Sequence, residues 1–153
     1  MKYDFLTVFR LVTATLLPVL LAVILYLAEG KTRFGKMNHR AKQWTIGVLF
    51  GGVAVLATEF GIPIEGAVLN VRNAAPLTAG LVFGGPAGIL AGVIGGVHRW
   101  FSTYWGAGEF SQLACSLAAI LAGIFGALCR KFMFDNKKAS WFYGLAIGGI
   151  TEV

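Results

Sequence analysis

Apolar residues run through the chain in long stretches, and charged residues gather in the short segments between them. Several stretches approach the roughly 20 residues that a helix needs to cross a bilayer. We expect helices over about residues 5–28, 44–60, 66–83, 87–105 and 110–132, followed by a sixth that starts near residue 141 and is cut short at residue 153. The pattern predicts an all-α membrane protein, a polytopic bundle of about six glycine-rich transmembrane helices with the last one truncated.

Proline and glycine mark where the predicted helices break. The second helix should end at the turn GIPIEG, residues 61–66. Residues 67–105 are too many for one membrane helix, and the GGP sequence at residues 84–86 offers a break, because proline lacks an amide proton and clashes with the preceding turn. We therefore expect two short antiparallel helices joined at this bend. Pro18 lies inside the first helix, which membrane helices tolerate.

Glycine recurs at every fourth position through both arms of this predicted hairpin. The positions are Gly80, Gly84, Gly88, Gly92 and Gly96. Small residues at this spacing let helix backbones approach closely in lipid, where no hydrophobic force joins the helices. No lysine follows in the register of a phosphate-binding loop. The glycines therefore predict dense helix packing.

Composition agrees with a membrane protein. Hydrophobic residues make up 57% of the chain and charged residues 13%, whereas a soluble domain carries about 25% charged residues. The mean hydropathy is +0.74. The net charge of +6 comes largely from two basic segments beside the apolar stretches, GKTRFGKMNHRAK and RKFMFDNKK. Such segments face anionic cytoplasmic lipid, so we expect the lipid bilayer as their partner and no nucleic acid.

The two basic segments should lie on the same side of the membrane, because four predicted helices separate them. The distribution of positive charge places that side in the cytoplasm. A completed sixth helix would then emerge on the outer side, whereas a cytoplasmic output domain requires the opposite. The shared side is therefore predicted, and the absolute orientation stays open.

Two arginines interrupt the apolar arms of the hairpin. Arg72 lies in the stretch LNVRNAAPLTAG, fourteen positions before Pro86, and Arg99 lies thirteen positions after it. In an antiparallel hairpin both should stand at a similar height, about 20 Å from the bend at about 1.5 Å per residue. An arginine inside a membrane span is costly and usually marks a function.

A small carboxylate would satisfy two guanidinium groups that face one cavity, because each planar fork can bind two oxygens. Side chains expected at the same level would orient the rest of the ligand. The predicted ligand-binding residues are Arg72, Arg99, Asn70, Cys115 and Ser111. Two simpler alternatives remain. Arg72 forms a structural ion pair with Glu65 or Glu59, or Arg99 extends to the membrane interface beside Trp100 and Trp105.

Other chemistry is not indicated by the sequence. Cys115 and Cys129 fall in one predicted helix, about 21 Å apart along its axis, which is too far for a disulfide. His98 is expected at the membrane interface, because no second metal ligand stands at a useful spacing. We expect no metal, no cofactor and no catalytic residues, since no nucleophile–base arrangement is present.

Several motifs together resemble the LytS-type transmembrane sensor domain. They are NVR followed by PLTAG, then GGPAGILAGVIGG and a helix ending in His-Arg, then QLACSLAAILAGIFG. The resemblance covers about residues 44–153. Residues 1–43 would then form a first transmembrane anchor and a basic linker. Arg72, Arg99 and Cys115 match the family's two arginines and its cysteine.

The resemblance implies a multi-pass receptor in a bacterial inner or plasma membrane. Such receptors precede a cytoplasmic signalling domain, most often a histidine kinase and sometimes a diguanylate cyclase, and can bind a small carboxylate such as pyruvate. The output domain would be missing from this chain, which would then be no enzyme, whereas the full-length protein would be a sensor histidine kinase or a diguanylate cyclase. A homodimer is expected by analogy with these outputs.

This chain departs from the family pattern in two places. Ala118 stands where a polar residue is expected, which leaves the identity of the ligand open, and the segment between Arg99 and Cys115 is longer than usual and contains Glu109. The family also looks related to the substrate-binding subunits of energy-coupling-factor transporters, which are six-helix bundles with similar Gly-Pro turns. Such a transporter subunit is the alternative interpretation.

Overall fold

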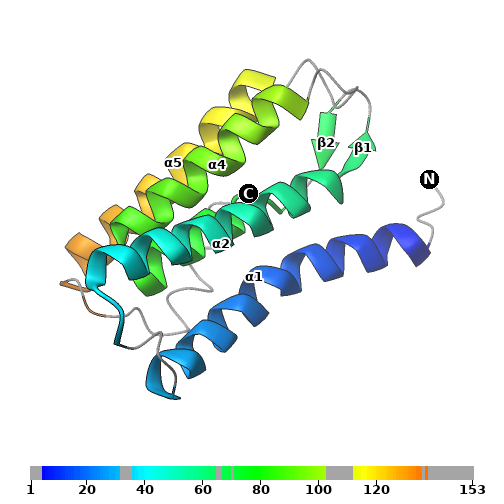
Figure 1. The fold of residues 1–153 in the computed structure, drawn as a ribbon. Coiled ribbons are helices and arrows are strands. Elements are labelled where there is room, and N and C mark those ends of the chain that lie inside the picture. The colour runs from blue at the N-terminus through cyan, green and yellow to red at the C-terminus, as the bar shows by residue number, and fades with distance from the viewer. Residues whose placement is uncertain are drawn as a thin grey trace.

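The computed structural model describes residues 5–31, 36–64, 67–69, 71–102, 112–135 and 137. Most of these residues are helical (Figure 1). The helices are α1 (Phe5–Lys31), α2 (His39–Glu59), α3 (Ala74–Thr78), the π-helix η2 (Ala79–Phe83), α4 (Gly85–Ser102) and α5 (Gln112–Met133). Two short strands, β1 (Ile62–Ile64) and β2 (Ala67–Leu69), lie between α2 and α3.

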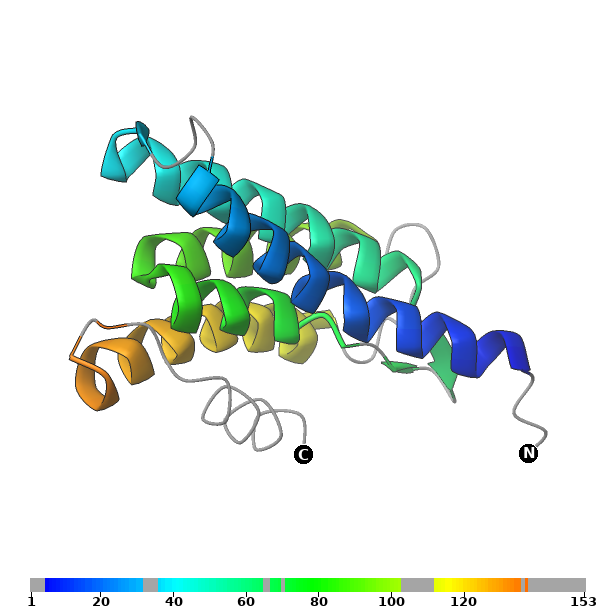
Figure 2. The same ribbon diagram turned by 90° about the horizontal axis from the view of Figure 1, so that it is seen from below.

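Helix α4 is the centre of the bundle and packs against both α2 and α5 (Figure 2). On α2, Gly47 lies against Leu90 and Gly51 against Ile94, so α2 and α4 run in the same direction. The side chains that fill this side of the core come mainly from α2, α3 and η2, and include Ile46, Phe50 and Phe83. The ring centroids of Phe50 and Phe83 are 5.7 Å apart. A mainly apolar core thus joins α2 to the hairpin.

Helices α4 and α5 run in opposite directions and approach each other backbone to backbone. A Cβ atom on Gly96 would lie 2.7 Å from the carbonyl oxygen of Ser116, and one on Gly123 would collide with the carbonyl oxygen of Gly88. Gly80 of η2 also packs on this contact, because a Cβ on Gly88 would lie 2.5 Å from its Cα. The predicted glycine packing is therefore confirmed where α4, α5 and η2 meet.

The predicted positions of α1, α2, α4 and α5 are confirmed over the described residues, with shifts at their ends. Helix α2 begins at His39, before the predicted start at residue 44, and its cap is Asn38, whose side chain accepts a hydrogen bond from the amide of Arg40 at 3.4 Å. Asparagine favours this position because it satisfies an amide that has no partner within the helix. The predicted sixth helix lies outside the described residues.

The prediction of one helix over residues 66–83 is wrong in its first part. Ala67–Leu69 pairs with Ile62–Ile64 as an antiparallel hairpin, and the helix begins only at Ala74. Short runs of β-branched residues on both sides of a turn favour extended structure. Pro76 also favours a helix start here, since proline in a first turn costs no hydrogen bond. The all-α class holds for the other elements of the described residues, and this short hairpin is the exception.

The predicted bend between the two arms is confirmed, and Gln43 of α2 holds it in place. Gly84 has φ 134°, a left-handed conformation that glycine adopts without strain. The side chain of Gln43 is buried, donates a hydrogen bond to the carbonyl oxygen of Phe83 at 2.7 Å, and accepts one from the amide of Ala87 at 3.2 Å. Gln43 therefore satisfies both backbone groups that the bend exposes.

We expect Gln43→Leu to lower the free energy of unfolding by about 1–3 kcal/mol, because it leaves the Phe83 carbonyl and the Ala87 amide buried without their partner. The measurement is thermal unfolding of the purified chain in detergent. Gln112→Leu is the matched control, since Gln112 donates a single, exposed hydrogen bond to the carbonyl of Trp100. Equal losses for the two variants would show that Gln43 does not hold the bend.

Two of the described helices, α2 and α5, are long and apolar enough to cross a membrane. Large apolar side chains also cover the outer surface of α1 and α4, for example Leu20 on α1 and Val97 on α4. Lys42 and Arg130, one from each basic segment, line the same pocket at one end of the bundle. The prediction that both basic segments share a side is thereby confirmed for these residues.

Candidate functional site

Arg72 lies in the turn before α3 and is only 1% exposed. Its Nη2 atom donates a hydrogen bond to the carbonyl oxygen of Cys115 on α5, at 2.7 Å. Its Cδ and Cγ atoms lie 3.7 and 3.9 Å from the point where a Cβ on Gly95 of α4 would stand. The Arg72 stem therefore lies beside α4 at Gly95, and the arginine bridges the turn, α4 and α5.

Arg99 lies in the last turn of α4 and is completely buried. Its Nη1 atom donates to the hydroxyl of Ser102 at 3.3 Å, and that hydroxyl in turn donates to the carbonyl oxygen of residue 99 at 2.9 Å. The alternative in which Arg99 extends to the interface beside Trp100 is therefore wrong, because no part of Arg99 reaches the surface whereas Trp100 is 42% exposed.

The stem of Arg72 contacts α4 on the face that carries Arg99, about one helical turn before it. Gly95, which contacts the Arg72 stem, precedes Arg99 by four residues, and this spacing places both positions on the same side of a helix, about 6 Å apart along its axis. The prediction gave them similar heights because it centred the hairpin on Pro86. The bend is centred on Gly84 instead, which shifts the arms by about one turn.

The other predicted site residues are placed only in part. Cys115 is half-buried, and its backbone carbonyl, which sequence reasoning did not consider, contacts Arg72. Asn70 and Ser111 lie outside the described residues. Cys115 and Cys129 both lie in α5 and are not bonded to each other, as the spacing predicted.

Glu59 lies beside His98, with 3.6 Å between its Oε1 atom and the Nε2 atom of the histidine. The alternative of a structural ion pair for Arg72 stays a prediction, because Glu65, one of its two candidate partners, lies outside the described residues. His98 is half-buried beside this carboxylate at the end of α4, where α2 also ends. This contact joins the end of α2 to α4 next to the buried Arg99.

Three polar residues near the arginines were missed by sequence reasoning. Ser102 contacts Arg99 directly. Ser116 follows Cys115 and is 6% exposed, and its hydroxyl, like the Oδ1 atom of Asn73, is buried with no hydrogen-bond partner among the described residues. Ser102 stands three positions after Arg99, and Ser116 and Asn73 each adjoin a predicted site residue, so sequence proximity was the available signal.

This arrangement is suited to holding an anion. Two guanidinium groups withdrawn from water are costly, and a negatively charged group offsets that cost when it reaches both. Buried hydroxyl and amide groups close to the arginines would complete the hydrogen bonding of such a ligand. The arginine site is defined here as Arg72 and Arg99 with the polar groups of Cys115, Ser116 and Ser102.

Known proteins are similar to this sequence. The family described as 5TM-5TMR_LYT, the 5TMR of 5TMR-LYT, matches residues 31–153. The sensor histidine kinase YpdA of Escherichia coli K12 is 31% identical over 141 residues, which cover 91% of this chain and 24% of YpdA. The sensor histidine kinase BtsS of the same strain is 25% identical over 107 residues, which cover 69% of this chain and 18% of BtsS. No solved structure matches the chain.

The chain spans about a quarter of the length of YpdA and less of BtsS. The matched part of this chain includes α2, the bend, α4, α5 and both buried arginines, so the family and the described site coincide. The chain therefore belongs to the 5TMR-LYT family of LytS-type transmembrane sensor domains, the membrane sensor domains of histidine kinases.

Proposed function

We propose that this chain is a multi-pass inner-membrane receptor domain that binds a small, pyruvate-like carboxylate and signals to a cytoplasmic histidine kinase domain. The observation that carries the proposal is that Arg72 and Arg99 are both at most 1% exposed and that the Arg72 stem contacts α4 at Gly95, about one turn before Arg99. The sensor role follows from the family, whereas the carboxylate ligand and the histidine kinase output are proposed.

A carboxylate fits the chemistry of the arginine site. Each of its two oxygens accepts hydrogen bonds from a guanidinium fork, and such charge-assisted bonds are about twice as strong as neutral ones. The hydroxyl of Ser116, which has no partner among the described residues, would bond a keto or hydroxyl oxygen of the ligand. We propose Asn70, Cys115 and Ser111 as the residues that orient the ligand further.

Binding at this position would join three elements. Arg72 belongs to the turn before α3, Arg99 belongs to α4, and the carbonyl that Arg72 already contacts belongs to α5. A ligand held by both arginines changes the balance of contacts among these elements, and any ligand shifts a conformational equilibrium by its difference in affinity for the two states. The proposed signal is this shift.

The two relatives favour one output over the others that the sequence left open. Both carry the name of sensor histidine kinase, and this chain covers only 24% and 18% of them, so the kinase would be supplied by the remainder of a longer protein. We therefore propose a histidine kinase rather than a diguanylate cyclase, and a receptor rather than a transporter subunit. The proposed receptor acts as a homodimer, as such kinases do.

We expect Arg72→Lys and Arg99→Lys each to weaken pyruvate binding at least about tenfold, because lysine keeps the charge and loses the fork. The measurement is isothermal titration of the purified chain in detergent with pyruvate. The control is Arg10→Lys on the exposed part of α1, which should bind as the parent does. Full affinity in either buried variant, at unchanged thermal stability, would remove that arginine from the ligand site.

A further inference from the structure

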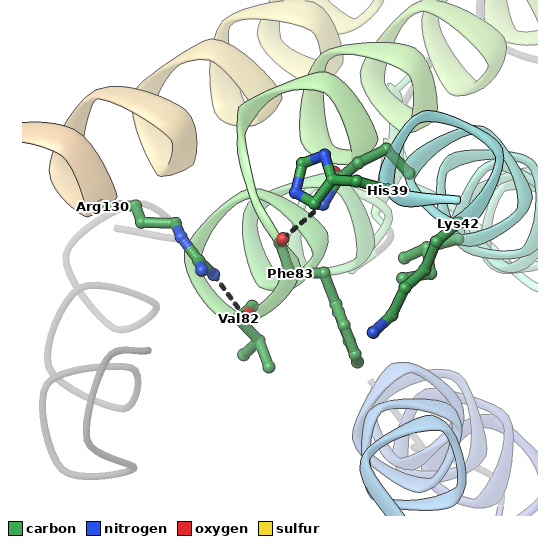
Figure 3. A pocket seen from close by; sticks show the side chains of 7 residues that line it. His39, Lys42, Val82, Phe83 and Arg130 are labelled. Carbon is green, nitrogen blue, oxygen red and sulfur yellow. Dashed lines mark hydrogen bonds between the residues drawn. The ribbon is translucent and has the colours of Figure 1, made fainter. Parts of the chain in front are cut away.

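A pocket lies at the end of the bundle opposite the arginine site (Figure 3). It encloses about 120 Å³ where the first turns of α2, the end of η2 and the end of α5 meet. Its lining residues are His39, Lys42, Gln43, Ile46, Val82, Phe83 and Arg130. Ala87, near this pocket, and Arg99 stand about 18 Å apart along α4 at about 1.5 Å per residue, so the two sites are separate.

This pocket, the basic pocket, has basic side chains on both sides of the end of η2. Figure 3 shows Arg130 on one side of the η2 end and His39 with Lys42 on the other. Of the described residues that line it, none is acidic. Lys42 and Arg130 bring positive charge to the two sides of this pocket, and positive charge attracts an anion.

The walls of the basic pocket are fixed by hydrogen bonds to the backbone. Arg130 donates from Nη1 to the carbonyl of Leu81 at 3.2 Å and also to the carbonyl of Val82. Gln43 holds the next carbonyl, that of Phe83. These three carbonyls end η2, where a cation is favoured by the helix dipole. Arg130 is thus positioned before any ligand arrives.

The basic pocket lies where the bundle meets the membrane surface. Helix α2, which is long and apolar enough to span, begins at His39, and Arg130 stands in the last turn of α5, which also qualifies as a span. Further exposed basic residues, Arg40 and Lys131, flank the pocket on these helices. The end of a span that is rich in lysine and arginine faces anionic lipid headgroups.

We propose that the basic pocket binds a phosphate group, supplied by the headgroup of an anionic phospholipid. Lysine and arginine are the side chains that bind phosphate oxygens, and basic pockets between transmembrane helices bind anionic headgroups. A volume of about 120 Å³ admits a single phosphate, whereas pockets for whole metabolites hold about 300 Å³ or more. Ile46, Val82 and Phe83 supply the apolar side that a glycerol backbone would meet.

A soluble phosphate carries the same chemistry, so the experiment has two arms. In the first, the purified chain is placed in nanodiscs of phosphatidylglycerol or of phosphatidylcholine, and its Tm is measured. In the second, the chain in detergent is titrated with inorganic phosphate. We expect phosphatidylglycerol to raise the Tm by on the order of 5 °C relative to phosphatidylcholine, as a ligand well above its Kd does.

The variants separate the basic pocket from general surface charge. Lys42→Gln should abolish most of this Tm difference, and so should Arg130→Gln, whereas Lys131→Gln removes the same charge from an exposed neighbour outside the pocket and should keep it. Lys42→Gln carries the test if Arg130→Gln fails to fold, because Arg130 also holds the η2 carbonyls.

Each outcome decides the proposal. A Tm increase that requires both phosphatidylglycerol and the Lys42 side chain supports the binding of a lipid headgroup. A shift with inorganic phosphate alone that also requires Lys42 supports the phosphate site and assigns it to a soluble ligand. Equal Tm values in the two lipids without a phosphate effect overturn the proposal, and so does a loss in Lys131→Gln as large as that in Lys42→Gln.

Discussion

Replacing Gly123 by alanine should destabilise the bundle by about 3 kcal/mol or more, the largest effect expected from a single methyl group in this protein. The new Cβ would collide with the carbonyl oxygen of Gly88 and would stand 2.8 Å from its carbonyl carbon. Both are backbone atoms, so no change of side-chain rotamer can relieve the overlap. The helices α4 and α5 would have to separate, and their contact is the most extensive in the described structure.

The measurement is the folded fraction and Tm of Gly123→Ala in detergent, by gel filtration and circular dichroism. Gly52→Ala is the matched control, because Gly52 stands on the exposed side of α2 and a Cβ there would have no atom within 4 Å. That substitution should stabilise the chain by up to about 1 kcal/mol, since alanine favours a helix interior over glycine. If the two variants behaved alike, the close approach of α4 and α5 would be refuted.

Arg99→Met should separate binding from stability. We expect pyruvate binding at least about 100-fold weaker, a loss of about 2.7 kcal/mol, because truncating one member of a buried charged contact typically costs about 2–5 kcal/mol. If Arg99 serves the ligand, the stability of the unliganded chain should stay within about 1 kcal/mol of the parent, whereas the loss of one member of a buried structural ion pair would cost about 3–5 kcal/mol. The hydroxyl of Ser102 keeps its bond to the carbonyl oxygen of residue 99 in this variant.

Titration calorimetry with pyruvate and thermal unfolding, both on the same preparation, check this prediction. Leu113→Met is the control, because it places methionine at an exposed position on α5 near the arginine level and should change neither quantity. A large loss of stability in Arg99→Met with unchanged affinity would identify the arginine as a structural ion-pair partner and would contradict the receptor proposal.

The sequence predicted the helices that cross the bundle because hydrophobic runs and breaking residues act locally. The bend at residues 84–86 follows from proline and glycine chemistry, and the shared side of Lys42 and Arg130 follows from the number of helices between them. The hairpin of β1 and β2 was missed because its residues, among them Val68, are as apolar as those of the adjoining helices, and a short apolar run does not distinguish strand from helix.

The sequence predicted the two arginines of the candidate site, but it did not predict the groups to which they donate hydrogen bonds. An arginine in an apolar run stands out in one sequence, so Arg72 and Arg99 could be found. The carbonyl of Cys115 that Arg72 binds leaves no mark on the sequence, because every residue carries the same backbone group. The clamp formed by Gln43 was missed for a related reason, since it joins groups about forty positions apart.

The glycine contact between α4 and α5 has a mechanical consequence. With backbone resting on backbone at Gly88 and Gly123, no flexible side chain lies between the two helices there to absorb a small displacement. The two helices would therefore move together as one rigid unit, which carries Arg99 near one end and Arg130 near the other. A displacement of Arg99 by a ligand would then also displace Arg130.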